Sequence, residues 1–260
     1  MPHILTVKNH VLCENPLGKL TLGQFLVTLG ALLPVYVLAL CVGKFAGKSN
    51  QGLDPAHLLT GDILFVSLAG LILYLVAGKP LGTSVAQVAR LRQNPKEPVS
   101  TVLVLGVGCY LLNLAAILAV LLFLMFPLCL AFRFQLPETA SELSQLIIRV
   151  FQHGSLVQKI VLGFDICLLT PIIEEAVCRG FLYQWLRTRM KIAPALVLSA
   201  VFFAIIHFDP GAMIVFIPVG LTTAIAFELS GSLISAILTH SLWNSTAILL
   251  TVLSANQPGT

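Results

Sequence analysis

Charged residues are scarce in this chain of 260 residues: aspartate, glutamate, lysine and arginine together make up 10%, whereas 57% of the residues are hydrophobic. The mean hydropathy of +0.96 lies outside the range of ordinary soluble domains and within that of proteins that cross a membrane several times. The composition therefore excludes a soluble globular protein. It predicts an integral, multi-pass membrane protein that is surrounded by a lipid bilayer.

Three other features are missing. Basic and aromatic residues do not alternate along any stretch, so the formal net charge of +4 gives no reason to expect a nucleic-acid partner. The six cysteines form no CxxC pair, and we interpret them mainly as small buried hydrophobic residues rather than as a disulfide framework. The first apolar run is too long for a signal peptide and no A-x-A-like site follows it, so we expect it to be retained as a span.

Long apolar runs divide the chain into candidate membrane spans, because a helix needs about 20 residues to cross a bilayer. The predicted fold class is accordingly all-α, a polytopic transmembrane helix bundle of about seven spans. The predicted spans lie near 21–43, 56–78, 101–132, 157–187, 193–208, 212–229 and 232–254.

The distribution of lysine and arginine between the loops predicts an orientation, since cytoplasmic loops are enriched in both residues. The N-terminal segment and the connections after the second and fourth spans together hold nine, and the opposite side holds five. This difference favours a cytoplasmic N-terminus.

The stretch PIIEEAVCRGFLYQWLRTRM, which begins at Pro171, places two carboxylates and an arginine in an otherwise apolar run. On a helix Glu175 and Arg179 face each other, so their charges can pair and hold the helix in register, whereas Glu174 points roughly 100° away. An ionised group at the bilayer centre costs about 2.5–3.5 kcal/mol on insertion scales, so such residues face the bundle interior and serve a function. Pro171 is expected to kink or restart the helix.

Two further pairs of residues share the spacing that places side chains on one helix face. Phe203 and His207 form the first pair in SAVFFAIIHFDP, and His240 and Asn244 form the second in SLISAILTHSLWNS. Each pair alone is a weak signal. In a chain so poor in polar residues, their appearance on successive predicted helices after Glu174 indicates a common site in the C-terminal half.

These residues have the chemical groups that peptide hydrolysis needs. A buried carboxylate that is not held by an arginine can act as a general base, and Glu174 is the candidate. His207 would orient the same water molecule, and His240 and Asn244 offer hydrogen-bond donors to a developing oxyanion. No serine or cysteine is positioned as a nucleophile, so we expect direct attack by water.

A metal-dependent reaction is the alternative chemistry. Glu174, His207 and His240 make up a His₂Glu set, which is a combination of ligands found in catalytic zinc sites. The usual HExxH helix is absent, and the ligands would come from three helices. We predict no cofactor and keep zinc as the open alternative.

The three motifs together resemble those of a known family. EExxxR from Glu174 to Arg179 followed by Gly-Phe-Leu, FxxxH ending at His207, and HxxxN beginning at His240 are similar to motifs of the CAAX protease and bacteriocin-processing (CPBP, or Abi) family of intramembrane proteases. This family includes the type II CAAX prenyl endopeptidases. The resemblance covers about 165–250 of the chain.

The resemblance implies an all-helical intramembrane core in which Glu174 and His207 activate water. It implies that the residues of the HxxxN motif stabilise the oxyanion, that the Glu175–Arg179 pair supports them, and that the mechanism can be independent of metal. One departure is mild, since residues 176–178 are smaller than is common in the variable centre of the first motif.

We predict three parts of the chain: residues 1–155 as N-terminal transmembrane helices with an amphipathic segment, 156–254 as a catalytic transmembrane core, and 255–260 as a tail. The predicted function is that of an intramembrane endopeptidase. Its substrate would be a membrane-associated peptide or protein, either prenylated or carrying a leader peptide. The sequence predicts no oligomeric state.

Two functions without catalysis stay open. The chain could be an immunity or scaffold protein that binds a peptide partner through the same cavity, or a transporter in which Glu174 and the histidines relay protons. A relay needs polar groups on both sides of the site, and Asp62 and Asp165 are the only further candidates.

The segment from Gln135 to Gly154 predicts an amphipathic helix on the membrane surface. Thr139 and Glu142 have the spacing of a capping box. Apolar residues recur with a helical period at Leu143, Leu146, Ile147 and Val150.

Overall fold

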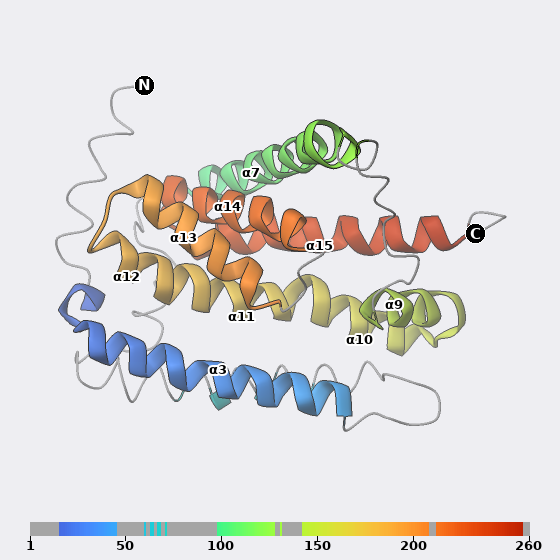
Figure 1. Cartoon of the computed structure of the whole chain (residues 1–260). Coiled ribbons are helices and arrows are strands. Elements are labelled where there is room, and N and C mark those ends of the chain that lie inside the picture. The colour runs from blue at the N-terminus through green and yellow to red at the C-terminus, as the bar shows by residue number, and fades with distance from the viewer. Residues whose placement is uncertain are drawn as a thin grey trace.

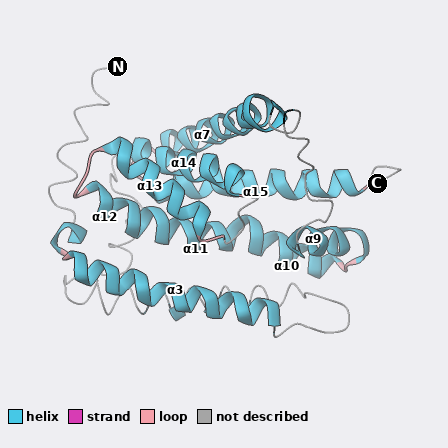
Figure 2. Cartoon of the chain, viewed as in Figure 1, coloured by secondary structure: helices cyan, strands magenta, loops and turns pink. Residues whose placement is uncertain are grey.

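The computed structural model describes residues 16–45, 60, 63–64, 67–68, 71, 98–127, 131, 142–207 and 212–256. These residues are mainly helical, as Figures 1 and 2 show, and the predicted all-α fold is confirmed. The α-helices are α3 (Leu22–Phe45), α7 (Val99–Val120), α9 (Glu142–His153), α10 (Leu156–Phe164), α11 (Thr170–Glu175), α12 (Gln184–Arg187), α13 (Ile192–Ile205), α14 (Met213–Ser230) and α15 (Leu233–Ala255). A 3₁₀ turn, η1 (Pro16–Lys19), precedes them, and three π-helical segments interrupt them: η3 (Leu121–Met125), η4 (Asp165–Leu169) and η5 (Ala176–Tyr183).

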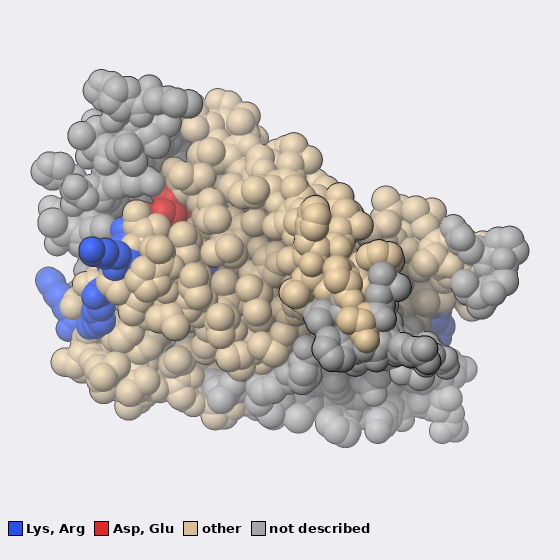
Figure 3. Space-filling view, turned by 45° about the horizontal axis from the view of Figure 1, so that its top comes forward, with Lys and Arg blue, Asp and Glu red and all other residues tan. Residues whose placement is uncertain are grey.

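Four helical segments of the described chain are long and apolar enough to cross a membrane: Val99–Met125, Leu156–Arg187, Met213–Ser230 and Leu233–Ala255. Large apolar side chains on their outer surfaces are exposed, and Phe123 reaches 82%. On the face shown in Figure 3, nearly all visible charged side chains gather at the ends and leave an uncharged middle. An apolar surface of this extent suits lipid rather than water, which confirms the integral membrane class. Most of the predicted span 56–78 lies outside the described residues.

One continuous helix runs from Leu156 to Arg187 through α10, η4, α11, η5 and α12. Ser155 begins it with a capping box, because its side chain accepts from the backbone N–H of Gln158 and the Gln158 side chain accepts in return. The backbone stays helical through Pro171, so of the two expected effects of this proline the restart is wrong and the kink stays a prediction. Proline removes one N–H and crowds the preceding turn, and the wider π turn of η4 accommodates both effects.

Close helix packing around α14 and α15 depends on two glycines. A Cβ atom on Gly220 of α14 would lie 3.0 Å from the Cα of Ala200 on α13. On α7, a Cβ atom at Gly106 would lie 3.1 Å from the carbonyl oxygen of Ser235 on α15. The Gly106 carbonyl accepts a hydrogen bond of 2.9 Å from the Thr239 hydroxyl. Any larger residue would force these helices apart, so the glycines bring two pairs of helices together, α13 with α14 and α7 with α15.

Helix α3 lies along the 156–187 helix (Figure 1) and is joined to it by aromatic side chains. The Phe25 ring stacks on Trp185 with ring centroids 3.6 Å apart, and on Phe181 at 5.3 Å. Leu17 and Leu20 are completely buried in the same core. The N-terminal segment therefore supports the helix that carries both glutamates.

Helix α9 forms where the sequence predicts an amphipathic helix. Its buried residues Leu146 and Val150 pack against Leu162 of α10 and Ile248 of α15. The apolar face thus covers other helices of the bundle. Thr139 of the predicted capping box lies outside the described residues.

Candidate active site

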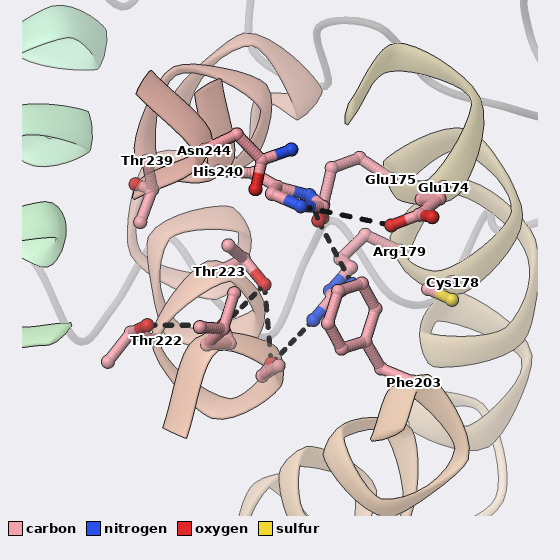
Figure 4. Close-up of polar contacts among 12 residues, drawn as sticks. Glu174, Glu175, Cys178, Arg179, Phe203, Thr222, Thr223, Thr239, His240 and Asn244 are labelled. Atoms are coloured by element: carbon pink, nitrogen blue, oxygen red, sulfur yellow. Dashed lines mark hydrogen bonds and ion pairs between the residues drawn. The ribbon is translucent and has the colours of Figure 1, made fainter. Parts of the chain in front are cut away.

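The Glu175–Arg179 pair lies at the centre of the bundle. The guanidinium donates from one nitrogen to Glu175 Oε1 at 3.1 Å, and both side chains are completely buried. A second guanidinium nitrogen donates to the carbonyl oxygen of Gly220 at 2.5 Å, and the guanidinium carbon lies 4.8 Å from the centroid of the Phe203 ring. The predicted contact along the helix is present. The guanidinium also links the 156–187 helix to α13 and α14, as Figure 4 shows for several of these residues.

His240 of α15 contacts the same carboxylate. Its Nδ1 lies 3.0 Å from Glu175 Oε1, which also accepts from Arg179. A carboxylate paired with a guanidinium is ionised and can only accept, so His240 Nδ1 carries the hydrogen. The other ring nitrogen, Nε2, is thereby directed at Glu174.

His207 lies just beyond the last residue of α13. Its Nδ1 lies 2.7 Å from the carbonyl oxygen of Phe203. A carbonyl oxygen only accepts, so Nδ1 is again the protonated nitrogen of the neutral ring. Phe203 of the FxxxH motif therefore contacts His207 in two ways. Its backbone carbonyl fixes the tautomer of the imidazole, and its ring lies against the imidazole ring.

Glu174 lies between the two histidines. Its Oε2 is 3.8 Å from Nε2 of His207 and 3.8 Å from Nε2 of His240. These distances exceed those of a direct hydrogen bond. Glu174 is 8% exposed, so the carboxylate and the two imidazoles meet in a nearly enclosed place within the bundle. The arrangement suits one small polar group that bridges Oε2 and the Nε2 atoms.

Asn244 lies one turn after His240 on α15 and is half-buried. Its Nδ2 donates to the carbonyl oxygen of Ile166 at 2.8 Å. That carbonyl belongs to the π-helical segment η4, so the amide links α15 to the helix that carries the glutamates. One amide hydrogen is used in this contact, and the amide group has a second hydrogen to offer.

The comparisons with known proteins bear on the same region. The model of the family described as type II CAAX prenyl endopeptidase, Rce1-like, matches residues 156–246. These residues include all three motifs and the elements from α10 to most of α15. This part of the chain is similar to the CAAX protease family, in agreement with the resemblance of the three motifs. Searches among curated proteins and among solved structures give no match.

The six predicted site residues come from three parts of the chain, and all but Asn244 contact or approach one another. Glu174, Glu175 and Arg179 lie on the 156–187 helix, His207 follows α13, and the remaining two lie on α15. His240 touches Glu175 directly and lies 3.8 Å from Glu174.

Sequence reasoning missed two residues that touch these groups, Gly220 and Phe216, and a third, Thr223, that binds Gly220. Gly220 supplies the second acceptor for Arg179, and Thr223 donates to the Gly220 carbonyl at 3.3 Å. Phe216 stacks on the ring of His207 with centroids 4.0 Å apart. All three lie on α14, which has no charged residue near the site, and no spacing in the sequence distinguishes them from ordinary core residues.

Glu174, His207 and His240 are the residues that would hold zinc in the alternative chemistry. Tetrahedral zinc with bonds of about 2.0–2.2 Å places its ligand atoms about 3.3–3.6 Å apart, and Oε2 of Glu174 is 3.8 Å from each histidine nitrogen. Among the described residues, no group of three histidine, cysteine, aspartate or glutamate side chains is arranged to hold a metal ion.

Proposed function

We propose that this protein is an intramembrane endopeptidase that uses water activated by Glu174 and His207. The observation that carries the proposal is the convergence of Glu174 Oε2 with Nε2 of His207 and of His240, each 3.8 Å away, inside a core that is similar to a family of CAAX endopeptidases. A water molecule between these atoms would lie beside a base and a second acceptor that orients it.

The two adjacent glutamates have different surroundings, which suits different roles. Arg179 and His240 both bind Glu175 Oε1, so this carboxylate is held by two partners. Glu174 Oε2 lies 3.8 Å from Nε2 of each histidine. We assign the proton transfer to Glu174 and the support of His240 to Glu175.

His240 and Asn244 supply the donors for the oxyanion. His240 Nε2 donates only if the ring carries a second proton. The Glu175 carboxylate, whose Oε1 is 3.0 Å from Nδ1 of His240, would stabilise the positive charge of such a ring. In well-studied hydrolases, loss of one preorganised donor of this kind raises the activation free energy by about 2.7–4 kcal/mol.

The reaction balances without a cofactor. Glu174 accepts a proton from water while the water oxygen attacks the peptide carbonyl carbon, and the carbonyl electron pair moves to the oxygen. When the intermediate collapses, the carbon–nitrogen bond breaks and Glu174 gives the proton to the leaving amine. The products are a carboxylic acid and an amine, and no covalent enzyme intermediate forms.

A peptide panel tests this function. The purified protein in phospholipid nanodiscs is incubated with a farnesylated peptide ending in a C-a-a-X sequence, the same peptide without the prenyl group, and an apolar leader-type peptide, and products are identified by mass spectrometry. We expect cleavage of at least one peptide by the wild type and none by Glu174→Gln. Binding without cleavage of any peptide would favour the immunity or scaffold alternative.

Chelation separates the two chemistries at the same site. The mechanism above predicts that 1,10-phenanthroline and EDTA leave the cleavage rate unchanged, because no step uses a metal. Loss of activity on chelation that is restored by added zinc, with one bound zinc per chain by elemental analysis, would replace this mechanism with the metal-dependent one.

A further inference from the structure

Phe216 lies against the face of the His207 ring. The two rings are 4.0 Å apart between centroids and 26° from parallel. Phe203 completes the group, with its centroid 4.8 Å from His207 and 6.5 Å from Phe216 in an edge contact. The imidazole is thus in contact with two aromatic rings that come from different helices.

The position of His207 explains why such a contact matters. The residue lies in a turn after the end of α13. The hydrogen bond from Nδ1 to the Phe203 carbonyl fixes one point of the ring, and a pivot about that point would turn Nε2 away from Glu174. A parallel ring 4.0 Å away blocks the pivot and holds Nε2 towards Glu174.

We propose that Phe216 is a positioning residue for His207, a role that rests on the proposed function. It touches the imidazole and keeps Nε2 aimed at the point where Glu174 Oε2 and the attacking water meet. No motif recognised in the sequence contains Phe216, which reaches the site from α14, nine positions after His207.

Packing alone predicts a different response from stacking. Phe216 also belongs to an apolar cluster with Val219 and Trp243, so loss of volume there would weaken the fold. Leucine keeps most of the volume but has no ring face, whereas tyrosine and tryptophan keep the face. Comparison of these substitutions isolates the stacking contact.

Steady-state cleavage of the best peptide of the panel measures the effect. Because aromatic pairs contribute about 0.5–1.5 kcal/mol, we expect Phe216→Leu to lower kcat by about 2- to 12-fold with KM unchanged. Phe216→Tyr and Phe216→Trp should recover most of the wild-type kcat. The neighbouring Ile217, which is 36% exposed, provides the control, and Ile217→Val should match the wild type.

A double-mutant cycle with His207→Ala tests whether the effect passes through the histidine. We expect Phe216→Leu to have no further effect in the His207→Ala background. Equal losses in both backgrounds, a change confined to KM, or equal losses for the leucine and tyrosine variants would overturn the positioning role. If His207→Ala itself retains full activity, the proposed function fails instead.

A measurement without substrate gives an independent result. In protein labelled with ¹³C at histidine Cε1, the His207 signal, assigned by its loss in His207→Ala, should lie upfield through the ring current of Phe216. It should move downfield in Phe216→Leu and stay in place in Ile217→Val. An unchanged position in Phe216→Leu would show that the rings do not stack and would overturn the inference.

Discussion

Replacement of Arg179 with methionine removes the charge that neutralises Glu175 and leaves a carboxylate inside the bundle. Both side chains are completely buried and are 3.1 Å apart, and the guanidinium also donates to the Gly220 carbonyl. Removal of one partner of a buried ion pair costs about 3–5 kcal/mol. For a chain of this size, that loss lowers the melting temperature by roughly 6–20 °C.

The double variant Arg179→Met with Glu175→Gln separates stability from activity. It has no unpaired charge at positions 175 and 179, and glutamine Oε1 still accepts from His240, so we expect most of the lost stability to return. Activity should not return, because a neutral glutamine no longer supports a protonated His240. Loss of one oxyanion donor corresponds to about a 10²- to 10³-fold lower kcat.

Thermal unfolding in detergent, followed by thiol-reactive dye, and peptide cleavage in nanodiscs measure the two quantities. A single variant Arg179→Met that melts within 2 °C of the wild type, roughly the shift expected for less than 1 kcal/mol, would refute the account of a buried pair. Recovery of wild-type activity in the double variant would refute the role of Glu175 in supporting His240.

Two further predictions concern packing. Gly220→Ala should lower the free energy of unfolding by about 1–3 kcal/mol and reduce activity, because the added carbon separates two helices and moves the carbonyl away from Arg179. Gly108→Ala, where a Cβ atom meets nothing within 4 Å, is the control. Equal melting temperatures of the two variants would contradict the reasoning. Phe25→Ala should lower the free energy of unfolding by about 3–5 kcal/mol in the same assay, because Phe25 is 3% exposed. Phe123→Ala, at an 82% exposed position, should have little effect. Similar losses at both positions would be inconsistent with α3 as a support of the core.

Contacts within one helix were predictable from the sequence. The spacing of Glu175 and Arg179 predicts their pairing, and the same spacing predicts that Phe203 and His207 meet, because residues four apart lie on one helical face. The apolar runs likewise predict the helices, with α10 to α12 ending where span 157–187 was expected to end. Local periodicity is sufficient for these features.

Contacts between helices were not predictable in the same way. Nothing in the sequence indicates that Gly220 offers its carbonyl to Arg179 or that Asn113 of α7, completely buried, accepts from Thr222 at 3.3 Å. These contacts depend on helix crossing and rotation. The π-helical segments η4 and η5, on either side of α11, also have no recognisable sequence pattern. Pro171 provides a physical reason for η4.

The rate of peptide cleavage by Glu174→Gln tests the central claim most directly. Glutamine keeps the shape of Glu174 but cannot accept a proton from water, so the single-turnover rate on the best peptide of the panel should fall by about 10²- to 10⁴-fold. Glu228→Gln, at a carboxylate that binds Tyr183 and Arg187 near the end of α14, should stay close to the wild type. A Glu174→Gln variant that is folded and cleaves at the wild-type rate would contradict the account.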